Sequence, residues 1–315
     1  MKLPRERCRT LALGKPVLIG DISVTAFPVD HSAYDGVALL IEADGKRLLY
    51  SGDLRLHGRR TTLVPALIKA ATSSPLDVLV MEGTHFSGHR QRGVTEMELE
   101  DEIFEQVQGA QGLVLAIFSP MHVDRLLSFY RAARRAGRTF VVDPYGAFVL
   151  HLLHARDGLP LPRVRAGVRV LYNVQFEQTW EKRNLGKIHR MFTGAKIEMA
   201  EILAEPARHA MLFRTSMLTR DFQDRLPAKV RCLYSYWHGY LEQPEWAALK
   251  TKLAAVGGDF IECHTSGHIF ADDIVKFVNA VNPRHIAPIH TSAPEAFLEL
   301  FPNTMQVADG EALVL

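Results

Sequence analysis

The chain has 315 residues, of which 47% are hydrophobic and 23% are charged, and its formal net charge is +2. This length can bury one large core or two ordinary ones, and the composition excludes a disordered or fibrous protein. The small net charge does not by itself indicate a nucleic-acid or membrane partner, although the basic runs 55–60 and 131–138 could form a local phosphate-binding patch.

The cysteine content and the N-terminal sequence bear on the cellular compartment. Three cysteines without metal-like spacing, Cys8, Cys232 and Cys263, argue against a disulfide framework. The first residues lack the apolar core of a signal peptide, and no apolar run has the length of a membrane span. We therefore expect a cytoplasmic protein with no membrane partner.

The first part of the chain alternates strand patterns with polar ends. Two of the predicted strands are joined by Asp44-Gly45, a strong hairpin signal. A short helix is predicted from Thr61 or Thr62, and the next apolar strand ends on Glu82. The strands predicted here are 22–29, 36–43, 46–51 and 76–82.

The middle of the chain alternates helices and strands. Thr95 and Glu98 have the spacing of a capping box, and Ser119-Pro120 precedes a helix that stops at Gly137. This alternation predicts a largely parallel sheet with covering helices. Its predicted strands are 112–118, 139–143, 168–172, 209–213 and 230–235.

The last segment repeats the pattern of the first. A strand at 259–263 leads into "HTSGH", and a helix at 271–281 precedes a strand, 285–290, that ends on His290. We therefore predict one domain split into residues 1–86 and 256–315, with a second domain, residues 87–255, inserted into it.

Imidazole and carboxylate groups follow several predicted strands. These groups are His31, Asp53, Glu82, the pair His264 and His268, and His290. Ligands gather at the carboxyl ends of strands in α/β folds, so the groups could converge in space. They form the ligand set expected for zinc or a similar divalent ion. An aspartate bridging two metals also suits phosphodiester hydrolysis.

Each group also has an ordinary structural explanation. His31 could be a hydrogen-bonded structural histidine, Asp53 a turn or cap residue, and Glu82 the partner of an arginine. The "HTSGH" loop and His290 could cap the helices that follow them. The sequence contains no P-loop, dinucleotide fingerprint or nucleophile elbow that would favour another chemistry.

The motifs "PVDHS", "YSGD", "VMEGT", "HTSGH" and "APIHT" occur in that order. Together they resemble the later motifs of metallo-β-lactamase-fold hydrolases of the β-CASP group, in the style of ribonuclease J. Segments of the middle block, such as "MLFRTSM" and "YWHGYLEQPEW", resemble the cap domain of those proteins. The resemblance implies an α/β fold in which an αββα metallo-β-lactamase sandwich carries an inserted β-CASP-like α/β cap.

The resemblance also implies a metal site. His31 corresponds to a ligand of the first metal, Asp53 to the aspartate that bridges both metals, and His290 to a ligand of the second. Two divalent ions are therefore expected, with zinc as the first choice and manganese as the alternative.

Further roles follow from the same resemblance. Glu82 corresponds to the acidic residue that opens the insert, and His268 to a histidine near the leaving group, a general acid or oxyanion stabiliser. The resemblance thus implies that His268, Glu82 and Asp53 are catalytic residues. His264 and Ser266 correspond to the loop that holds a substrate phosphate.

One motif of the family is missing. The principal metal motif, H-x-H-x-D-H, should precede "PVDHS", yet no histidine precedes His31. We therefore expect the sandwich to be N-terminally incomplete, with open strand edges and an uncovered apolar face. Three explanations are a truncated hydrolase, a degenerate relative that binds without cutting, and a chain completed by another polypeptide.

The function predicted from these features is metal-dependent hydrolysis of a phosphodiester, foremost RNA, through metal-bound hydroxide. Whether the chain is active without the missing motif is left open. One alternative is a non-catalytic module that binds nucleic acid or a protein partner, and another is hydrolysis of a small ester or lactam. Association into a homo-oligomer is also left open.

Overall fold

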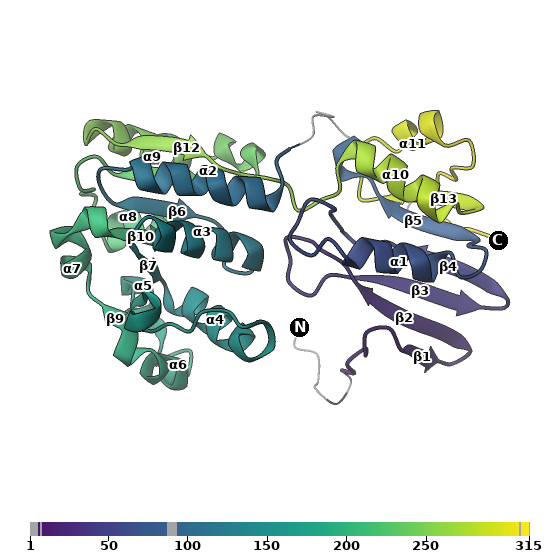
Figure 1. Ribbon diagram of the computed structural model, residues 1–315, viewed down its shortest axis with the longest axis horizontal. Helices are drawn as coiled ribbons and strands as arrows, with labels where there is room; N and C mark the ends of the chain where they lie inside the picture. Colours follow the sequence, from purple (N-terminus) through teal and green to yellow (C-terminus); the bar gives the residue numbers. More distant parts are fainter. Residues whose placement is uncertain (1–5, 7, 87–92, 309, 315) are drawn as a thin grey trace. The chain divides into compact units, whose positions relative to one another are not determined.

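The computed structural model describes residues 6, 8–86, 93–308 and 310–314. The chain forms two compact units (Figure 1). The first consists of Met1–Gly93 together with Ser266–Leu315, and the second is the continuous segment Val94–Thr265. Among the described residues, no helix combines the length and the apolar character that crossing a bilayer requires.

The first unit is built on a six-stranded mixed sheet. Strands β1 to β4 pair antiparallel with one another, whereas β5 is parallel to both β4 and β13. The predicted hairpin is present, because Asp44 and Gly45 take the positive φ angles, 50° and 71°, of its tight turn. In sheet order the strands are β1 (Pro16–Ile19), β2 (Ile22–Pro28), β3 (Val37–Ala43), β4 (Lys46–Tyr50), β5 (Val78–Glu82) and β13 (His285–Ile289).

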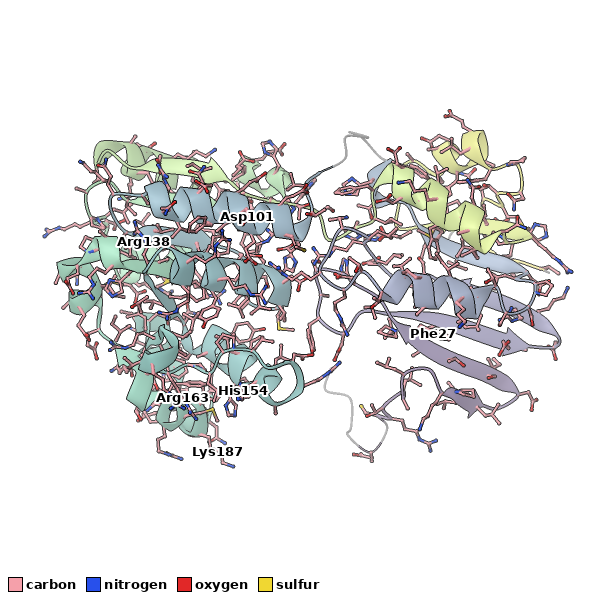
Figure 2. All side chains as sticks on the ribbon, in the orientation of Figure 1. Phe27, Asp101, Arg138, His154, Arg163 and Lys187 are labelled. Atoms are coloured by element: carbon pink, nitrogen blue, oxygen red, sulfur yellow. The ribbon has the colours of Figure 1, made fainter. Side chains whose placement is uncertain are left out.

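Helices cover one face of this sheet. Helices α1 (Leu63–Ala71) and α10 (Ala271–Val281) share a buried cluster with inward-facing strand residues such as Leu40, Leu49 and Leu79. The labelled Phe27 packs at the margin of this cluster (Figure 2). A 3₁₀ turn, η2 (Thr84–Phe86), and α11 (Glu295–Leu300) complete the unit.

The second face of the sheet is also apolar. Side chains alternate between the two faces of a strand, so Leu39, Ile41 and Leu48 point away from the helices. These three are half-buried, and Tyr50 on the same face is 38% exposed. The described residues of this unit form one sheet whose second face is apolar and partly exposed.

The second unit is a seven-stranded sheet in which every pairing is parallel, as predicted. Its order is β12 (Asp259–Glu262), β11 (Arg231–Tyr234), β6 (Val114–Ile117), β10 (His209–Leu212), β7 (Thr139–Val142), β8 (Val168–Leu171) and β9 (Lys196–Ile197). The helices are α2 (Glu96–Gly109), α3 (Val123–Arg135), α4 (Pro144–Asp157), α5 (Val174–Thr179), α6 (Gly186–Met191), α7 (Met199–Ala204), α8 (Thr215–Arg220) and α9 (Pro244–Ala255). Short 3₁₀ turns lie at η3 (Val164–Ala166), η4 (Thr193–Ala195), η5 (Pro206–Arg208) and η6 (His238–Glu242).

The units divide the chain at different points from the predicted domains. Strand β12 pairs with β11, so residues 256–265 lie in the second unit and not in the first, where the sequence prediction placed them. The other predicted boundary, at residue 87, falls outside the described residues. Beyond it, the predicted capping box is formed, because Thr95 and Glu98 bond reciprocally at the start of α2.

Several arginines of the two basic runs make contacts within the protein. Arg55 is fully buried, and its Nε lies 2.7 Å from Asp30 Oδ1. Arg138, labelled in Figure 2, is also buried and donates to the carbonyl oxygens of Gly112 and Ala110. In the same run Arg135 pairs with Asp101 at 2.7 Å. These arginines therefore pair with other groups of the protein, either in its interior or, for Arg135, at its surface.

Candidate metal centre

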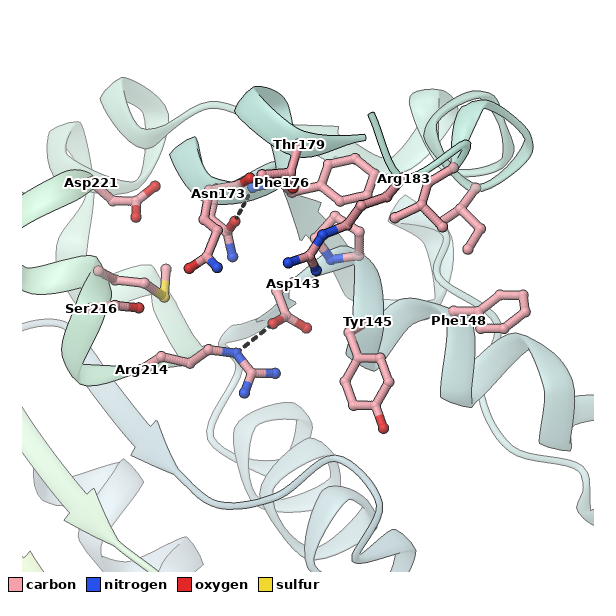
Figure 3. A pocket seen from close by; sticks show the side chains of 15 residues that line it. Asp143, Tyr145, Phe148, Asn173, Phe176, Thr179, Arg183, Arg214, Ser216 and Asp221 are labelled. Carbon is pink, nitrogen blue, oxygen red and sulfur yellow. Dashed lines mark hydrogen bonds and ion pairs between the residues drawn. The ribbon is translucent and has the colours of Figure 1, made fainter. Parts of the chain in front are cut away.

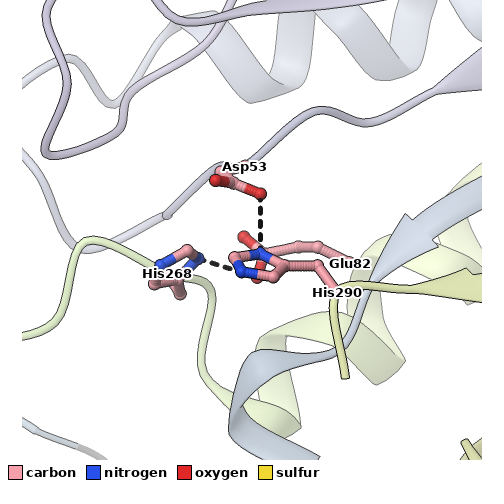
Figure 4. A group of neighbouring side chains, drawn as sticks. All are labelled: Asp53, Glu82, His268 and His290. Carbon is pink, nitrogen blue, oxygen red and sulfur yellow. Dashed lines mark hydrogen bonds and ion pairs between the residues drawn. The ribbon is translucent and has the colours of Figure 1, made fainter. Parts of the chain in front are cut away.

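Four strands of the first sheet end at the same edge. Strands β2 and β4 are both antiparallel to β3, and β5 and β13 run parallel to β4, so all four point the same way. His31, Asp53, Glu82 and His290 stand at or just beyond these four ends. His268 joins them from the loop before α10, and Figure 4 shows four of the side chains facing one another. The first unit thus brings together five of the residues predicted from the sequence.

The Asp53 carboxylate lies between two imidazoles. His290 Nδ1 is 3.0 Å from Asp53 Oδ1 (Figure 4), and His31 Nε2 is 3.9 Å from Asp53 Oδ2. Each carboxylate oxygen therefore has its own imidazole nitrogen. This is the arrangement that a carboxylate bridging two cations needs.

The local backbone explains how these side chains reach the edge. Gly52 has a φ of 58°, and a Cβ at this position would lie 2.5 Å from the carbonyl oxygen of Val37. Only glycine fits there, and it turns the chain so that Asp53 follows β4 directly. His290 itself has a φ of 48°, a left-handed conformation that is uncommon for residues other than glycine. Such backbone conformations are concentrated at functional sites.

His31 is held with one nitrogen directed toward Asp53. Its Nδ1 lies 2.6 Å from the carbonyl oxygen of Gly267, which can only accept, so Nδ1 carries the proton of the neutral ring. Nε2 then keeps its lone pair, with Ser32 Oγ at 3.2 Å as a further neighbour. Burial lowers the pKa of His31, outweighing the hydrogen bond to Gly267 and the nearby carboxylates. A neutral imidazole oriented through its second nitrogen is the form that binds metals.

Glu82 acts as a buried hydrogen-bond acceptor. Its Oε1 accepts the Leu54 N–H at 2.9 Å, and its Oε2 accepts Thr84 Oγ1–H at 2.9 Å and lies 3.0 Å from His268 Nδ1. Burial opposes the charged form of His268, but the hydrogen bond and charge of Glu82, with help from Asp53, raise its pKa above the ordinary value. Glu82 therefore orients His268 and favours its protonated form.

Four of these side chains lie close enough together to share a metal ion. One potential ligand atom from each of Asp53, Glu82, His268 and His290 lies within 4.8 Å of all the others. Two ligands of a tetrahedral zinc, each about 2.0–2.1 Å from the ion, lie roughly 3.3 Å apart, close to the Asp53–His290 distance of 3.0 Å. His31 Nε2 is farther away, at 3.9 Å from Asp53 Oδ2. The donor set fits a divalent ion, although each ion would need further donors to reach three or four.

The two residues predicted to hold a phosphate fall in different units. His264 belongs to the second, where its Nδ1 lies 3.2 Å from the carbonyl oxygen of Ser235 and 3.4 Å from Arg125 Nη1. Ser266 belongs to the first, where its Oγ accepts the N–H of His268 at 3.0 Å. Ser266 therefore shapes the turn that carries His268.

Two supporting residues were missed by the sequence analysis. Thr84 bonds Glu82, and the Gly267 carbonyl fixes the His31 ring. A Cβ at Gly267 would lie 2.4 Å from Ser32 Oγ, so a side chain would displace this contact. Both residues stand inside motifs that had been quoted, "VMEGT" and "HTSGH", which is the signal that could have identified them.

Comparisons with known proteins give a family context for this geometry. The profile of the RMMBL family, described as a Zn-dependent metallo-hydrolase RNA specificity domain, matches residues 256–297. Ribonuclease J of Mycobacterium tuberculosis (strain CDC 1551 / Oshkosh) is 21% identical over 304 residues, covering 92% of this chain and 52% of that protein. Ribonuclease J of Mycolicibacterium smegmatis (strain ATCC 700084 / mc(2)155) is 24% identical over 313 residues, covering 91% of this chain and 51% of that one.

A solved structure supports the fold. The crystal structure of a protein of unknown function from Enterococcus faecalis V583 superposes with a TM-score of 0.76 and 23% identity, covering 97% of this chain and 67% of that chain. The chain spans about half the length of the curated relatives it matches, 52% and 51%. The predicted α/β fold and the resemblance to ribonuclease J-like proteins of the β-CASP metallo-β-lactamase group are confirmed.

Proposed function

We propose that the first unit holds divalent metal, foremost zinc, at Asp53, and that the protein hydrolyses phosphodiester bonds of RNA. In this proposal His31 and His290 are metal ligands and Asp53 joins two ions. Bound divalent ions would polarise the phosphate and activate a water molecule as nucleophile. The RNA substrate is suggested by the relatives, which are ribonucleases J, and by the description of the matching family.

The observation that carries the proposal is the placement of Asp53 between two imidazoles that come from opposite ends of the chain. A carboxylate acting only as a turn or cap residue needs one hydrogen-bond donor from the backbone. Asp53 instead has one imidazole nitrogen near each oxygen, at 3.0 Å and 3.9 Å. Aligned carboxylate and imidazole groups of this kind are characteristic of zinc and related ions.

Glu82 and His268 would handle the proton of the reaction. Glu82 is fully buried, and it holds the Nδ1 proton of His268 at a distance of 3.0 Å. The second nitrogen, Nε2, can then give a proton to the oxygen that leaves phosphorus. Glu82 is in this view a positioning residue, because its hydrogen bonds are satisfied by Leu54, Thr84 and His268.

The first experiment measures metal bound to the purified chain. Elemental analysis after equilibration with zinc is expected to find close to two ions per chain in the wild type. Replacing Asp53 by Ala should abolish most binding, and His290→Ala should remove at least one ion. His285→Ala is the matched control, because His285 is an exposed histidine at the opposite end of the same strand. Binding that is absent, or unchanged by Asp53→Ala, would refute the metal assignment.

A second experiment separates metal binding from catalysis. His268→Ala should keep its metal and lose cleavage of a labelled single-stranded RNA by about 100-fold or more, the usual range for a general acid. Equal cleavage by wild type and His268→Ala would contradict the role given to His268. Bound RNA without any cleavage by metal-loaded wild type would instead favour the non-catalytic alternative.

A further inference from the structure

The second unit contains a cavity at the carboxyl ends of three neighbouring parallel strands. It has a volume of about 550 Å³, and the residues that follow β7, β8 and β10, namely Asp143, Asn173 and Arg214, contribute to its wall (Figure 3). This edge is where parallel α/β sheets place their ligands, and the volume lies in the range of small-molecule sites. None of the proposed metal-centre residues lines it.

One side of the cavity offers aromatic surface. Tyr145 and Phe148 come from α4, and Phe176 comes from α5. In Figure 3 Phe148 lies farther from the Arg183 guanidinium than Phe176 does. Tyr145 is 48% exposed and the two phenylalanines are partly exposed, so ring surface is available to a ligand. Flat aromatic side chains beside a cavity are suited to stacking on a nucleobase.

The cavity also carries positive charge beside the rings. Arg214 is balanced by Asp143, whose Oδ2 accepts from Arg214 Nε at 2.8 Å. In the described part of the chain, no hydrogen bond or ion pair is made by the Arg183 guanidinium. The turn beneath it is fixed, because Arg183 N–H donates to the Thr179 carbonyl and Leu185 N–H to that of Trp180. Arg183 is thus an exposed cation on a fixed turn, with capacity to bind an anion.

The other side of the cavity provides groups for polar recognition. Asn173 Oδ1 accepts the Phe176 N–H at 2.9 Å, which leaves the amide NH₂ of Asn173 as a donor. Asp221 accepts the Val174 N–H through Oδ1, and its buried Oδ2 makes no hydrogen bond among the described residues. Burial raises the pKa of Asp221. A donor and an acceptor opposite an aromatic wall match the hydrogen-bonding edge of a base.

We propose that this cavity binds a nucleotide, with the base against Tyr145, Phe148 and Phe176 and a phosphate on Arg183. The ligand chemistry could come from a free nucleoside monophosphate or from one nucleotide of an RNA strand. The inference goes beyond the proposed function, because it concerns the second unit alone and needs neither metal nor hydrolysis.

The test measures binding to the full chain by isothermal titration calorimetry in the presence of a chelator. The probes are adenosine and uridine 5′-monophosphate, hexauridylate and inorganic phosphate. Arg183→Ala and Tyr145→Ala change exposed side chains, and Arg165→Ala is the matched control, an exposed arginine outside the cavity. We expect Arg183→Ala to weaken binding about tenfold and Tyr145→Ala about fivefold or more, with Arg165→Ala unchanged.

The probes distinguish the sources of the ligand. If a monophosphate binds and its binding depends on Arg183 and Tyr145, the ligand is a free nucleotide. If only hexauridylate binds with this dependence, the ligand is an RNA strand. Inorganic phosphate binding as tightly as the nucleotides would overturn the proposal, because the rings would contribute nothing. Nucleotide affinities that are unchanged in both Arg183→Ala and Tyr145→Ala would also overturn the proposal. Asp53→Ala should bind like the wild type, so failure of the metal assignment would leave this result unaffected.

Discussion

The fully buried Arg125 of the second unit allows a quantitative prediction. Its Nε and Nη2 contact the two oxygens of Glu96 at 2.9 and 3.3 Å, and both side chains have no exposed surface. Arg125 also donates to the carbonyl oxygens of Ser235 and Thr265, at 3.1 Å each. The arginine therefore joins the start of α2 to the ends of β11 and β12.

Replacing Arg125 by Met would take the guanidinium away from the buried Glu96 carboxylate, which keeps the Ser128 hydroxyl at 3.2 Å and His122 Nε2 at 3.8 Å. Removing one member of a buried pair costs about 3–5 kcal/mol, and each stranded carbonyl adds about 1 kcal/mol or more. We therefore expect the free energy of unfolding to fall by at least about 4 kcal/mol. The double variant Arg125→Met, Glu96→Gln should recover about 2 kcal/mol or more of this loss, because no charge is then buried alone.

Urea unfolding followed by tryptophan fluorescence is the assay. All three tryptophans, at positions 180, 237 and 246, lie in the second unit, and Trp246 belongs to its buried core. The signal therefore reports the unit that contains Arg125. Arg135→Ala is the control, because its pair with Asp101 is exposed and should contribute no more than about 1 kcal/mol. Equal stability of the Arg125→Met and Arg135→Ala variants would refute the reasoning.

Three further predictions concern other parts of the chain. Gly52→Ala should lower the free energy of unfolding by about 1–3 kcal/mol, because its Cβ would lie 2.5 Å from the Val37 carbonyl oxygen. The same variant should bind zinc more weakly in calorimetry. An unchanged zinc affinity would contradict the placement of Asp53. Zinc at about 100 times its dissociation constant should stabilise the first unit by about 2.7 kcal/mol, seen in scanning calorimetry but not in tryptophan fluorescence. Burial raises the pKa of Cys263 to about 12, so iodoacetamide near pH 8 should label exposed Cys8 but not Cys263 in the native protein, as peptide mass spectrometry would reveal.

The strands and the edge where polar groups meet could be predicted from periodicity. Apolar runs gave β2 to β5 and β13 within one or two residues, because each run has the length and composition of a buried strand. The short β1 and the two-residue β9 were missed, since β1 is largely exposed and β9 is too short to show a period. The small helices α5 to α8 were missed for the same reason, with six residues each.

Other features depend on contacts that no local pattern encodes. The second unit ends at residue 265 because β12 pairs with β11. The apolar pattern of a strand does not indicate which other strand it pairs with, so this boundary could not be predicted. Arg55 was predicted as part of a basic surface run, yet it is fully buried against Asp30, and the buried pair of Arg125 with Glu96 was not predicted at all. The bonds of Glu82 to His268, and of His31 to Gly267, likewise join residues about two hundred positions apart.

The division of the first unit between both parts of the chain has a consequence for biosynthesis. Asp53 and His290 are 237 positions apart, and at about 5–20 residues per second a ribosome needs roughly ten to fifty seconds to pass from one to the other. The second unit is continuous and can fold during that interval, whereas the β5 edge stays unpaired until β13 has been made. An open edge of this kind attracts other strands. The nascent first unit is therefore the part of this protein that most needs a chaperone before its centre can assemble.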